Sequence, residues 1–342
     1  MAENIVELLT DVANAIREKK GTSEPINAQS FADEIKNLPS GSAPRWTGHA
    51  DVEGLKAIGW DDDDIAYYQQ YGVNWNEEDD EYHKVSDDNK ALYGVVTASN
   101  YQSYSSRIVY LPKIEINKGS MAFNNFQVLV AMPLLKMAGS TSYFYIFNGC
   151  RSLACCPPLD LSAATEFSEM FTGTSSLQHI PPLLLAKATS ISTMFNSTGY
   201  HGSVTITAPN VTTVGNTFRS CAGISSINLQ VKTAPFSESA FAGCHALREL
   251  HIKADSVTLI GEYIFNNCVS LSRPYIQNLA SSVSFAFSPL IEKDALLYII
   301  NNAIPPTEGI TIKLHKSAFE KLAEDADVVA ALANHPNVSL AK

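Results

Sequence analysis

Cysteines and histidines are the residues of this chain that could bind a metal ion or carry out nucleophilic chemistry. There are six cysteines and eight histidines, and no two cysteines have the C-x-x-C spacing of a zinc or redox site. The histidines are scattered, and the sequence contains no H-E-x-x-H, G-x-S-x-G or P-loop motif. Four cysteines instead share one position of a recurring pattern, which favours small buried thiols over metal ligands. We therefore predict no metal, no cofactor and no enzymatic activity.

The recurring pattern is a phenylalanine at intervals of 23 or 24 residues. Three residues after it comes a cysteine or threonine, and three residues farther an aliphatic residue, as in FAGCHAL from Phe241. A repeat of this length lies in the leucine-rich-repeat range, where each unit buries its apolar face only by stacking on its neighbours. The pattern predicts a solenoid of about seven repeats with internal ladders. The recurring residues are Phe123, Phe147, Phe171, Phe195, Phe218, Phe241 and Phe265.

The units resemble BspA-type leucine-rich repeats of bacterial surface proteins, because AFAGCHALRELHI from Ala240 matches their pattern AFxxCxxLxxIxI. Units with a Met-Phe pair, such as Met170-Phe171, resemble a related subtype. Two units depart from the pattern: His201 replaces an aliphatic residue, and Phe126 replaces the cysteine of the Phe123 unit, which we expect to be the first, capping coil. The resemblance implies a mixed α/β repeat solenoid over roughly residues 110–290, a scaffold with many binding roles.

Alternation within the repeat strands separates inward from outward residues. In LRELHIKA, Leu250 and Ile252 are expected to point inward, and Glu249, His251 and Lys253 outward. Repeat scaffolds usually bind through such an extended face, although an ordinary solvated surface is the alternative for any single residue. The predicted ligand-binding residues are Gln178, His179, Asn228, Gln230, Arg248, His251, Lys253, Arg273, Tyr275 and Gln277.

The first 40 residues have helical periodicity with one apolar face. A first helix is expected to stop near Gly21, and a second follows the capping signal Ser30-x-x-Asp33 and ends at the linker PSGSAP. Such a hairpin has little core of its own, so we predict that it packs on copies of itself in a homo-oligomer, a trimer. The predicted oligomerisation residues are Ile5, Leu8, Leu9, Val12, Ile16, Trp60 and Trp75.

Acidic residues are concentrated at the start of the chain. Residues 1–100 carry 20 acidic and 8 basic side chains, whereas residues 101–342 carry 15 and 16. Within an expected helical neck, GWDDDDIAYYQQYG is followed by NWNEEDDEYHKVSD. Clustered carboxylates could bind calcium, but no calcium-loop spacing is present, and acids that cap helix N-termini are the favoured interpretation. The sequence has no basic stripe, which argues against a nucleic-acid partner.

The last 50 residues change in character. ITIKL and NVSLA alternate as strands, and SAFEKLAEDADVVAALA between them has a helical pattern. A βαβ-like cap of this kind would shield the apolar edge of the last repeat. We therefore divide the chain into residues 1–40 (helical attachment segment), 45–100 (acidic tryptophan-containing neck), 101–290 (solenoid) and 291–342 (α/β cap).

The N-terminal pattern LLxxxANAIRxKKG followed by INAQxFAxEIKNLP resembles segments of gut bacteriophage tail proteins. This resemblance implies a virion tail-fibre protein that contacts other virion proteins through its N-terminus and recognises a bacterial surface glycan or protein receptor. A BspA-like adhesin at the bacterial cell surface is the alternative. No apolar run is long enough to insert into a membrane. The N-terminus lacks a secretory signal pattern, so we expect a chain used without Sec export or one whose leader has been removed.

Overall fold

The computed structural model describes residues 51–71, 85–116, 119–134, 139–156, 159, 161–180 and 183–342. These described residues all belong to one compact unit. Most of the predicted oligomerisation residues, and the two predicted N-terminal helices, lie outside the described residues, so these predictions stay open. The oligomerisation residues concerned are Ile5, Leu8, Leu9, Val12, Ile16 and Trp75.

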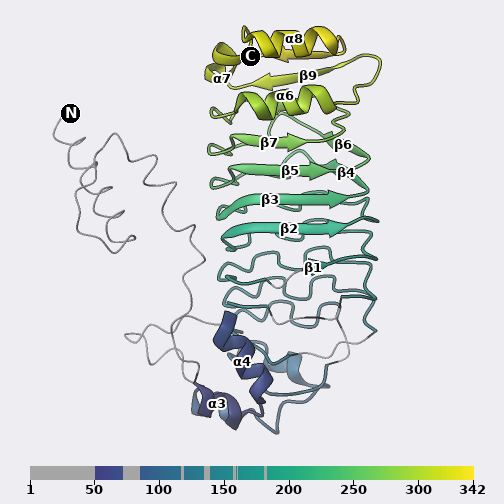
Figure 1. Cartoon of the computed structure of the whole chain (residues 1–342). Coiled ribbons are helices and arrows are strands. Elements are labelled where there is room, and N and C mark those ends of the chain that lie inside the picture. Colours follow the sequence, from purple (N-terminus) through teal and green to yellow (C-terminus); the bar gives the residue numbers. More distant parts are fainter. Residues whose placement is uncertain are drawn as a thin grey trace, which may run out of the picture. The chain divides into compact units, whose positions relative to one another are not determined.

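Parallel strands, one from each successive coil, stack into a five-stranded sheet in the order β1-β2-β3-β5-β7 (Figure 1). Alternation gives each strand a buried and an outward side, as in β3, where Ile227 and Leu229 are buried and Asn228 is exposed. A separate two-stranded sheet pairs β4 with β6. The bounds are β1 Leu183–Leu184, β2 Gly202–Ala208, β3 Ile224–Val231, β4 Thr233–Phe236, β5 Glu249–Lys253, β6 Ser256–Leu259 and β7 Arg273–Ile276.

The seven recurring phenylalanines form a buried ladder through the middle of the solenoid. Each ring stacks on the next with centroids between 5.2 and 5.9 Å apart, from Phe123 to Phe265. The predicted repeat solenoid is therefore confirmed. An eighth ring, Phe285, stacks on Phe265 at 5.0 Å, and the period does not predict it because this last spacing is shorter. At the other end Tyr101 packs on Phe123 and Phe126 and closes the ladder.

The turn after each ladder phenylalanine explains the small residues of the repeat. The thiol of Cys244 donates a hydrogen bond to the carbonyl of Phe218 in the preceding coil at 3.0 Å, and three other cysteines make equivalent bonds. The residue two after each of the seven recurring phenylalanines has a positive φ, which glycine, asparagine and serine tolerate better than bulky residues. These residues are Asn125, Gly149, Gly173, Ser197, Ser220, Gly243 and Asn267.

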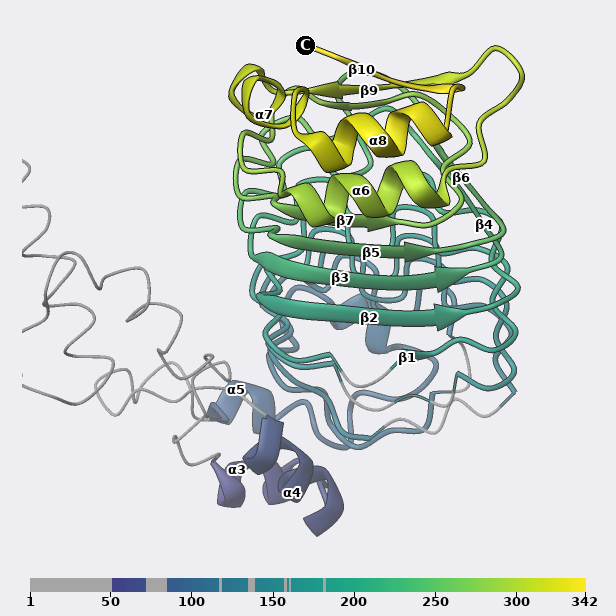
Figure 2. The same ribbon diagram turned by 45° about the horizontal axis from the view of Figure 1, so that its top comes forward.

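Helix α6 (Lys293–Asn302) takes the place of the next strand after β7. The N–H of Glu292 donates to the carbonyl of Ser272, just before β7, and the N–H of Asn278, just after β7, donates to the carbonyl of Asn302. Helix α6 therefore runs alongside β7 in the same direction, and α8 (Ala326–Asn334) follows it in the stack (Figure 2). Helix α6 was not among the elements expected from the sequence.

The rest of the C-terminal cap forms a second parallel sheet with the order β10-β9-β8. The predicted strands are confirmed as β9 (Ile310–Leu314) and β10 (Val338–Ala341), and β8 (Val283–Phe285) belongs to the last coil. The helical stretch between β9 and β10 is two helices, α7 (Lys316–Leu322) and α8, because Asp325 caps a new helix by accepting from two backbone N–H groups.

Short helices precede the solenoid. They are α3 (Val52–Ala57), α4 (Asp62–Tyr71), α5 (Asp87–Lys90) and the 3₁₀ helix η3 (Tyr101–Tyr104). Leu92, Val96 and Tyr101 share the core of the solenoid, so this segment continues its packing. Within the described part of the chain, no helix combines the length and apolar character needed to cross a bilayer.

Candidate functional site

Helix α4 covers the outward side of the first coils. Trp60, just before α4, packs on Tyr68 with ring centroids 5.1 Å apart, and its Nε1–H donates to the carbonyl of Leu111 at 2.8 Å. Ala131 and Cys155, which occupy outward positions of their coils, are buried in the same cluster. The residues at these outward positions are small or apolar because a helix packs on them.

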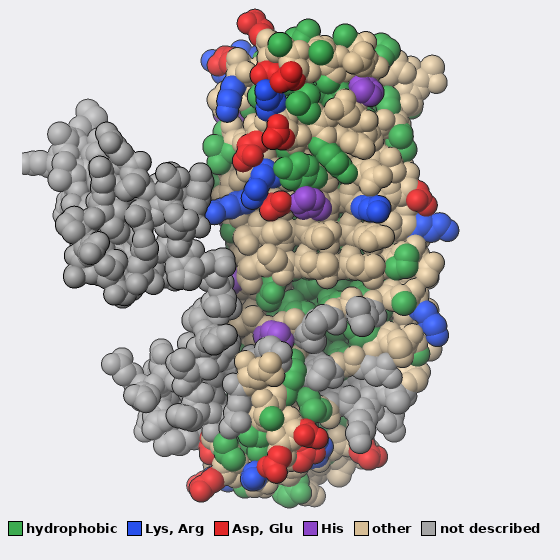
Figure 3. Space-filling view, in the orientation of Figure 1, with side chains coloured by type: hydrophobic (Ala, Val, Ile, Leu, Met, Phe, Trp, Pro, Cys, Tyr) green, Lys and Arg blue, Asp and Glu red, His purple; other side chains and the backbone are tan. Residues whose placement is uncertain are grey.

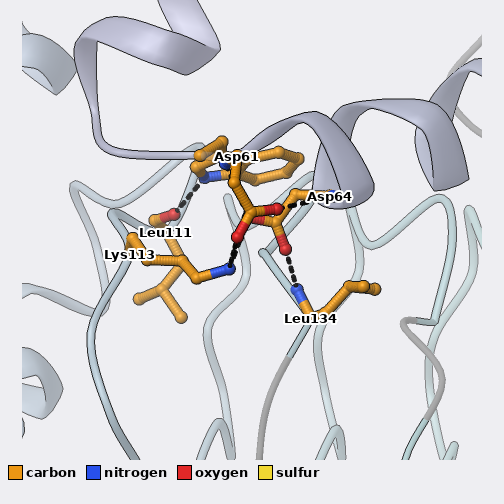
Figure 4. Close-up of polar contacts among 6 residues, drawn as sticks. Asp61, Asp64, Leu111, Lys113 and Leu134 are labelled. Carbon is orange, nitrogen blue, oxygen red and sulfur yellow. Dashed lines mark hydrogen bonds and ion pairs between the residues drawn. The ribbon is translucent and has the colours of Figure 1, made fainter.

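A polar cluster fixes the start of α4 to the solenoid (Figure 4). Asp61 and Asp64 each accept a hydrogen bond from the other's backbone N–H at 3.0 Å. Asp64 is fully buried, accepts the N–H of Leu134 at 2.7 Å, and lies 2.6 Å from Nζ of Lys113. The hydrogen bond from the Asp64 N–H, together with the bond to Lys113, lowers the pKa of Asp61 to about 2. The helix-capping interpretation is confirmed for Asp61 and Asp64, and the described residues include no metal-ligand cluster.

Trp60, one of the predicted oligomerisation residues, is buried within its own chain. Its side chain is only 3% exposed and is enclosed by α4 and the first coils of its own chain. This burial favours anchoring within the chain, and the predicted role of Trp60 in oligomerisation stays a prediction. Its contacts anchor the neck to the solenoid.

Beyond α4, the outward side of the sheet is exposed and polar. We call the outward residues of β2, β3, β5 and β7 the strand face. Figure 3 shows uncharged side chains over β2 and β3, and charged, histidine and hydrophobic side chains gathered over β5 and β7. The strand registers align these residues in three rows across the sheet. The rows are Ser203, Ser226, Glu249 and Arg273; Thr205, Asn228, His251 and Tyr275; and Thr207, Gln230 and Lys253.

Aromatic and charged side chains contact one another at the β7 end of the strand face. The rings of His251 and Tyr275 stack with centroids 4.7 Å apart, and Tyr298 of α6 meets Tyr275 edge-on at 5.5 Å. Glu249 lies between two partners, with its Oε1 2.8 Å from Nε2 of His251 and its Oε2 accepting from Nη2 of Arg273 at 3.3 Å. These contacts give the side chains defined positions, which lowers the entropy cost of binding a ligand.

Eight of the ten predicted binding residues lie on or beside the strand face. Six stand on β3, β5 and β7, Arg248 is exposed just before β5, and Gln277 follows β7. The inward positions of Leu250 and Ile252 are confirmed. The predicted set omits Tyr298 and the residues of β2, although the alternation in VTITA marks Thr205 and Thr207 as outward.

The other two predicted residues, Gln178 and His179, belong to an earlier coil at the border of α4. The backbone of His179 forms a parallel β-bridge with that of Cys155, and the ring of His179 lies 6.2 Å from that of Tyr67 on α4. Burial lowers the pKa of His179. Of the predicted site, these residues mark the edge nearest the neck, while Tyr275 marks the opposite edge against α6.

Comparisons with known proteins identify the repeats. A family model described as "BspA type Leucine rich repeat region" matches residues 189–293 in six copies, so the repeats of this region are similar to BspA-type leucine-rich repeats. A leucine-rich repeat protein from Bacteroides ovatus ATCC 8483, known from a crystal structure, is 15% identical, with coverage of 64% of this chain and 82% of that chain and a TM-score of 0.21. The comparison with curated proteins found no match.

Proposed function

We propose that this chain is a non-enzymatic recognition protein whose strand face binds a receptor on a bacterial surface. One observation carries the proposal: three aligned rows of outward polar side chains, with an aromatic cluster at one end, stand on a rigid ladder-packed scaffold. Hydroxyl and amide groups both donate and accept hydrogen bonds, so such rows suit a ligand that is rich in hydroxyl or amide groups. A surface glycan and a polar protein receptor both have this chemistry.

Two biological settings remain for such a face. The resemblance of the N-terminal motif to segments of phage tail proteins supports a virion tail-fibre protein, with the N-terminus contacting other virion proteins. The BspA-type repeats support the alternative, an adhesin on a bacterial cell. An antibody against the chain distinguishes the two settings in electron micrographs, because it would label phage tails in the first case and cell envelopes in the second.

The binding proposal is tested by attachment of the labelled full chain to a panel of bacterial strains. We expect that replacing four residues of the face together by alanine abolishes attachment to any strain that the wild-type chain binds, with the circular-dichroism spectrum unchanged. Attachment of that variant at the wild-type level would contradict the proposal. The four residues are Arg248, His251, Arg273 and Tyr275.

A matched control carries four alanines at positions outside the five-stranded sheet. These side chains are wholly or partly exposed, so their loss should leave both the fold and attachment unchanged. Equal loss of attachment in the control would show that the effect is not specific to the strand face. The control positions are Lys187, Glu238, Asp255 and Thr258.

A further inference from the structure

The strand face has a helix at each end. Helix α4 rests on the outward side of the first coils, where its Tyr67 meets His179. Helix α6 lies beside β7, where its Tyr298 meets Tyr275. A helix with its side chains is about 10 Å across, which is thicker than a strand, so both helices project beyond the plane of the sheet. In the described part of the chain the strand face is thus a strip between two helices.

The spacing of parallel strands gives the dimensions of this strip. From the coil of His179 to that of Arg273 there are four strand intervals, or about 19 Å, and the seven residues of β2 extend for about 23 Å. As a flat rectangle, the strip therefore has an area of about 400 Å². A stable protein–protein interface needs about 800 Å² from each partner and an apolar centre.

The centre of this strip is polar. Over β2 and β3 the outward side chains are hydroxyls and amides, and Thr205, Thr207, Asn228 and Gln230 are all exposed. The aromatic groups of the strand face, His251 and Tyr275, stand at the edge beside Tyr298 of α6 and not in the middle. Area and composition thus both disfavour a folded protein as the ligand and favour a narrow, hydroxyl-rich one.

Resting on the proposed binding function, we infer that the ligand is a linear polysaccharide whose chain lies parallel to the strands, between α4 and α6. The two helices stand at the two ends of the strand face, so a chain crossing the strands along the rows would meet a helix, whereas a chain parallel to the strands would not (Figure 1). Each strand offers a polar side chain at every second residue, which matches a polymer with hydroxyl groups along its length. Tyr275 and Tyr298 supply apolar ring surface for the C–H groups of a sugar.

The charge on the strip is compatible with binding of either a neutral or an acidic polysaccharide. Glu249 is paired with Arg273 and His251, whereas Arg248 and Lys253 are exposed at the two ends of β5. An acidic chain would contact both basic side chains, and a neutral chain would need neither. Replacing Arg248 and Lys253 together by alanine therefore separates the two kinds of polysaccharide, because only binding of an acidic chain should weaken, by more than tenfold.

The test uses a bacterial strain to which the full chain attaches. Cells are treated with periodate, which oxidises sugar diols, or with protease. Size-graded fragments of the polysaccharide extracted from that strain then compete for attachment. We expect periodate but not protease to abolish attachment. We also expect the half-inhibitory concentration to fall at least tenfold as fragments lengthen to about the 23 Å of the strip, and to change little beyond that.

Two double variants show where the fragments bind. Thr205→Ala with Asn228→Ala removes a central hydroxyl and amide, and should raise the half-inhibitory concentration of long fragments at least tenfold. Thr258→Ala with Glu238→Ala, outside the sheet, should leave it unchanged. The two double variants should differ in the same way in binding to polysaccharide that is coupled to beads through its reducing end. The inferred binding mode, with the polysaccharide parallel to the strands, needs no free chain end.

The outcomes separate this inference from the function on which it rests. Attachment through the strand face that resists periodate but is lost with protease would overturn the polysaccharide and leave receptor binding intact. Inhibition by monosaccharides as strong as by long fragments would overturn the extended chain. Attachment to no strain, or wild-type attachment by the variant with four alanines in the strand face, would overturn the proposed function itself.

Discussion

Phe241 shows how single residues hold the solenoid together. Its buried ring stacks on Phe218 and Phe265 at 5.7 and 5.2 Å and also contacts Phe236. Phe241→Ala should lower the free energy of unfolding by about 3–5 kcal/mol, the usual cost of emptying an aromatic core site. Urea denaturation measures the change, with Val269→Ala at an exposed position as the control. A loss below about 1 kcal/mol would contradict the ladder.

The six cysteines are free and buried, which predicts slow thiol chemistry in the folded protein. Burial raises the pKa of Cys150 and of Cys155 to about 12, against about 8.5 in an unfolded chain. The contribution of these protonated thiols to the stability of the folded state is therefore fully present below about pH 8.5 and is lost as the pH rises toward 12. A thiol reagent at pH 8 should find no reactive cysteine until denaturant is added, when all six react. Rapid reaction of the native protein would refute their burial.

The sequence predicts residues of the core better than residues of contacts between segments. A buried phenylalanine or cysteine repeats with the period, so the period alone assigns Phe241 and Cys244 to the core. Trp60 occurs outside the repeat, and tryptophan is found both inside proteins and at their interfaces. Only the fold shows that its Nε1–H reaches the carbonyl of Leu111.

At the scale of elements, the attachment of α4 depends on Asp64. Removing this buried carboxylate in Asp64→Ala leaves the N–H of Leu134 without its acceptor and leaves the ammonium of Lys113 with Asp61 alone. We expect α4 to detach and stability to fall by about 2–3 kcal/mol, less than for a fully buried pair because Lys113 is partly exposed.

Hydrogen–deuterium exchange measures this detachment directly. Amides of residues 62–71 should lose protection in Asp64→Ala, while the amides of β3 and β5 keep theirs. Asp63→Ala, at an exposed position of the same helix, is the control and should exchange like the wild-type chain. Unchanged protection in Asp64→Ala would show that the polar cluster does not fix the neck.

The sequence predicts only some of the elements that lie outside the repeat. The strands β9 and β10 follow from alternation, but α6 was missed because its apolar residues fall in the run LLYIINNAIPP, where a strand and a buried helix look alike. The buried set Ala295, Leu296, Ile299 and Ile300 has helical spacing, so the signal was present. That α6 would stand at the end of the strand face could not be inferred from the sequence, since it depends on how the last coil continues.

At the scale of the whole molecule, the apolar face expected within residues 1–40 still predicts a homo-oligomer, a trimer. Several weakly binding faces on one particle would raise the effective concentration of each, which suits attachment to a surface. Light scattering of the full chain at micromolar concentration should give the mass of a trimer, and Leu8→Asp with Val12→Asp should reduce it to that of a monomer. A monomeric wild-type chain would contradict this prediction.

The most direct test of the account maps the bound surface on the unaltered protein. Hydroxyl-radical footprinting is carried out on the free chain and on the chain attached to cells. Binding through the strand face predicts protection of His251, Tyr275 and Tyr298, with unchanged oxidation of the exposed Tyr93 and Tyr263. Protection of Tyr263 with no change at Tyr275 and Tyr298 would place the receptor elsewhere and contradict the account.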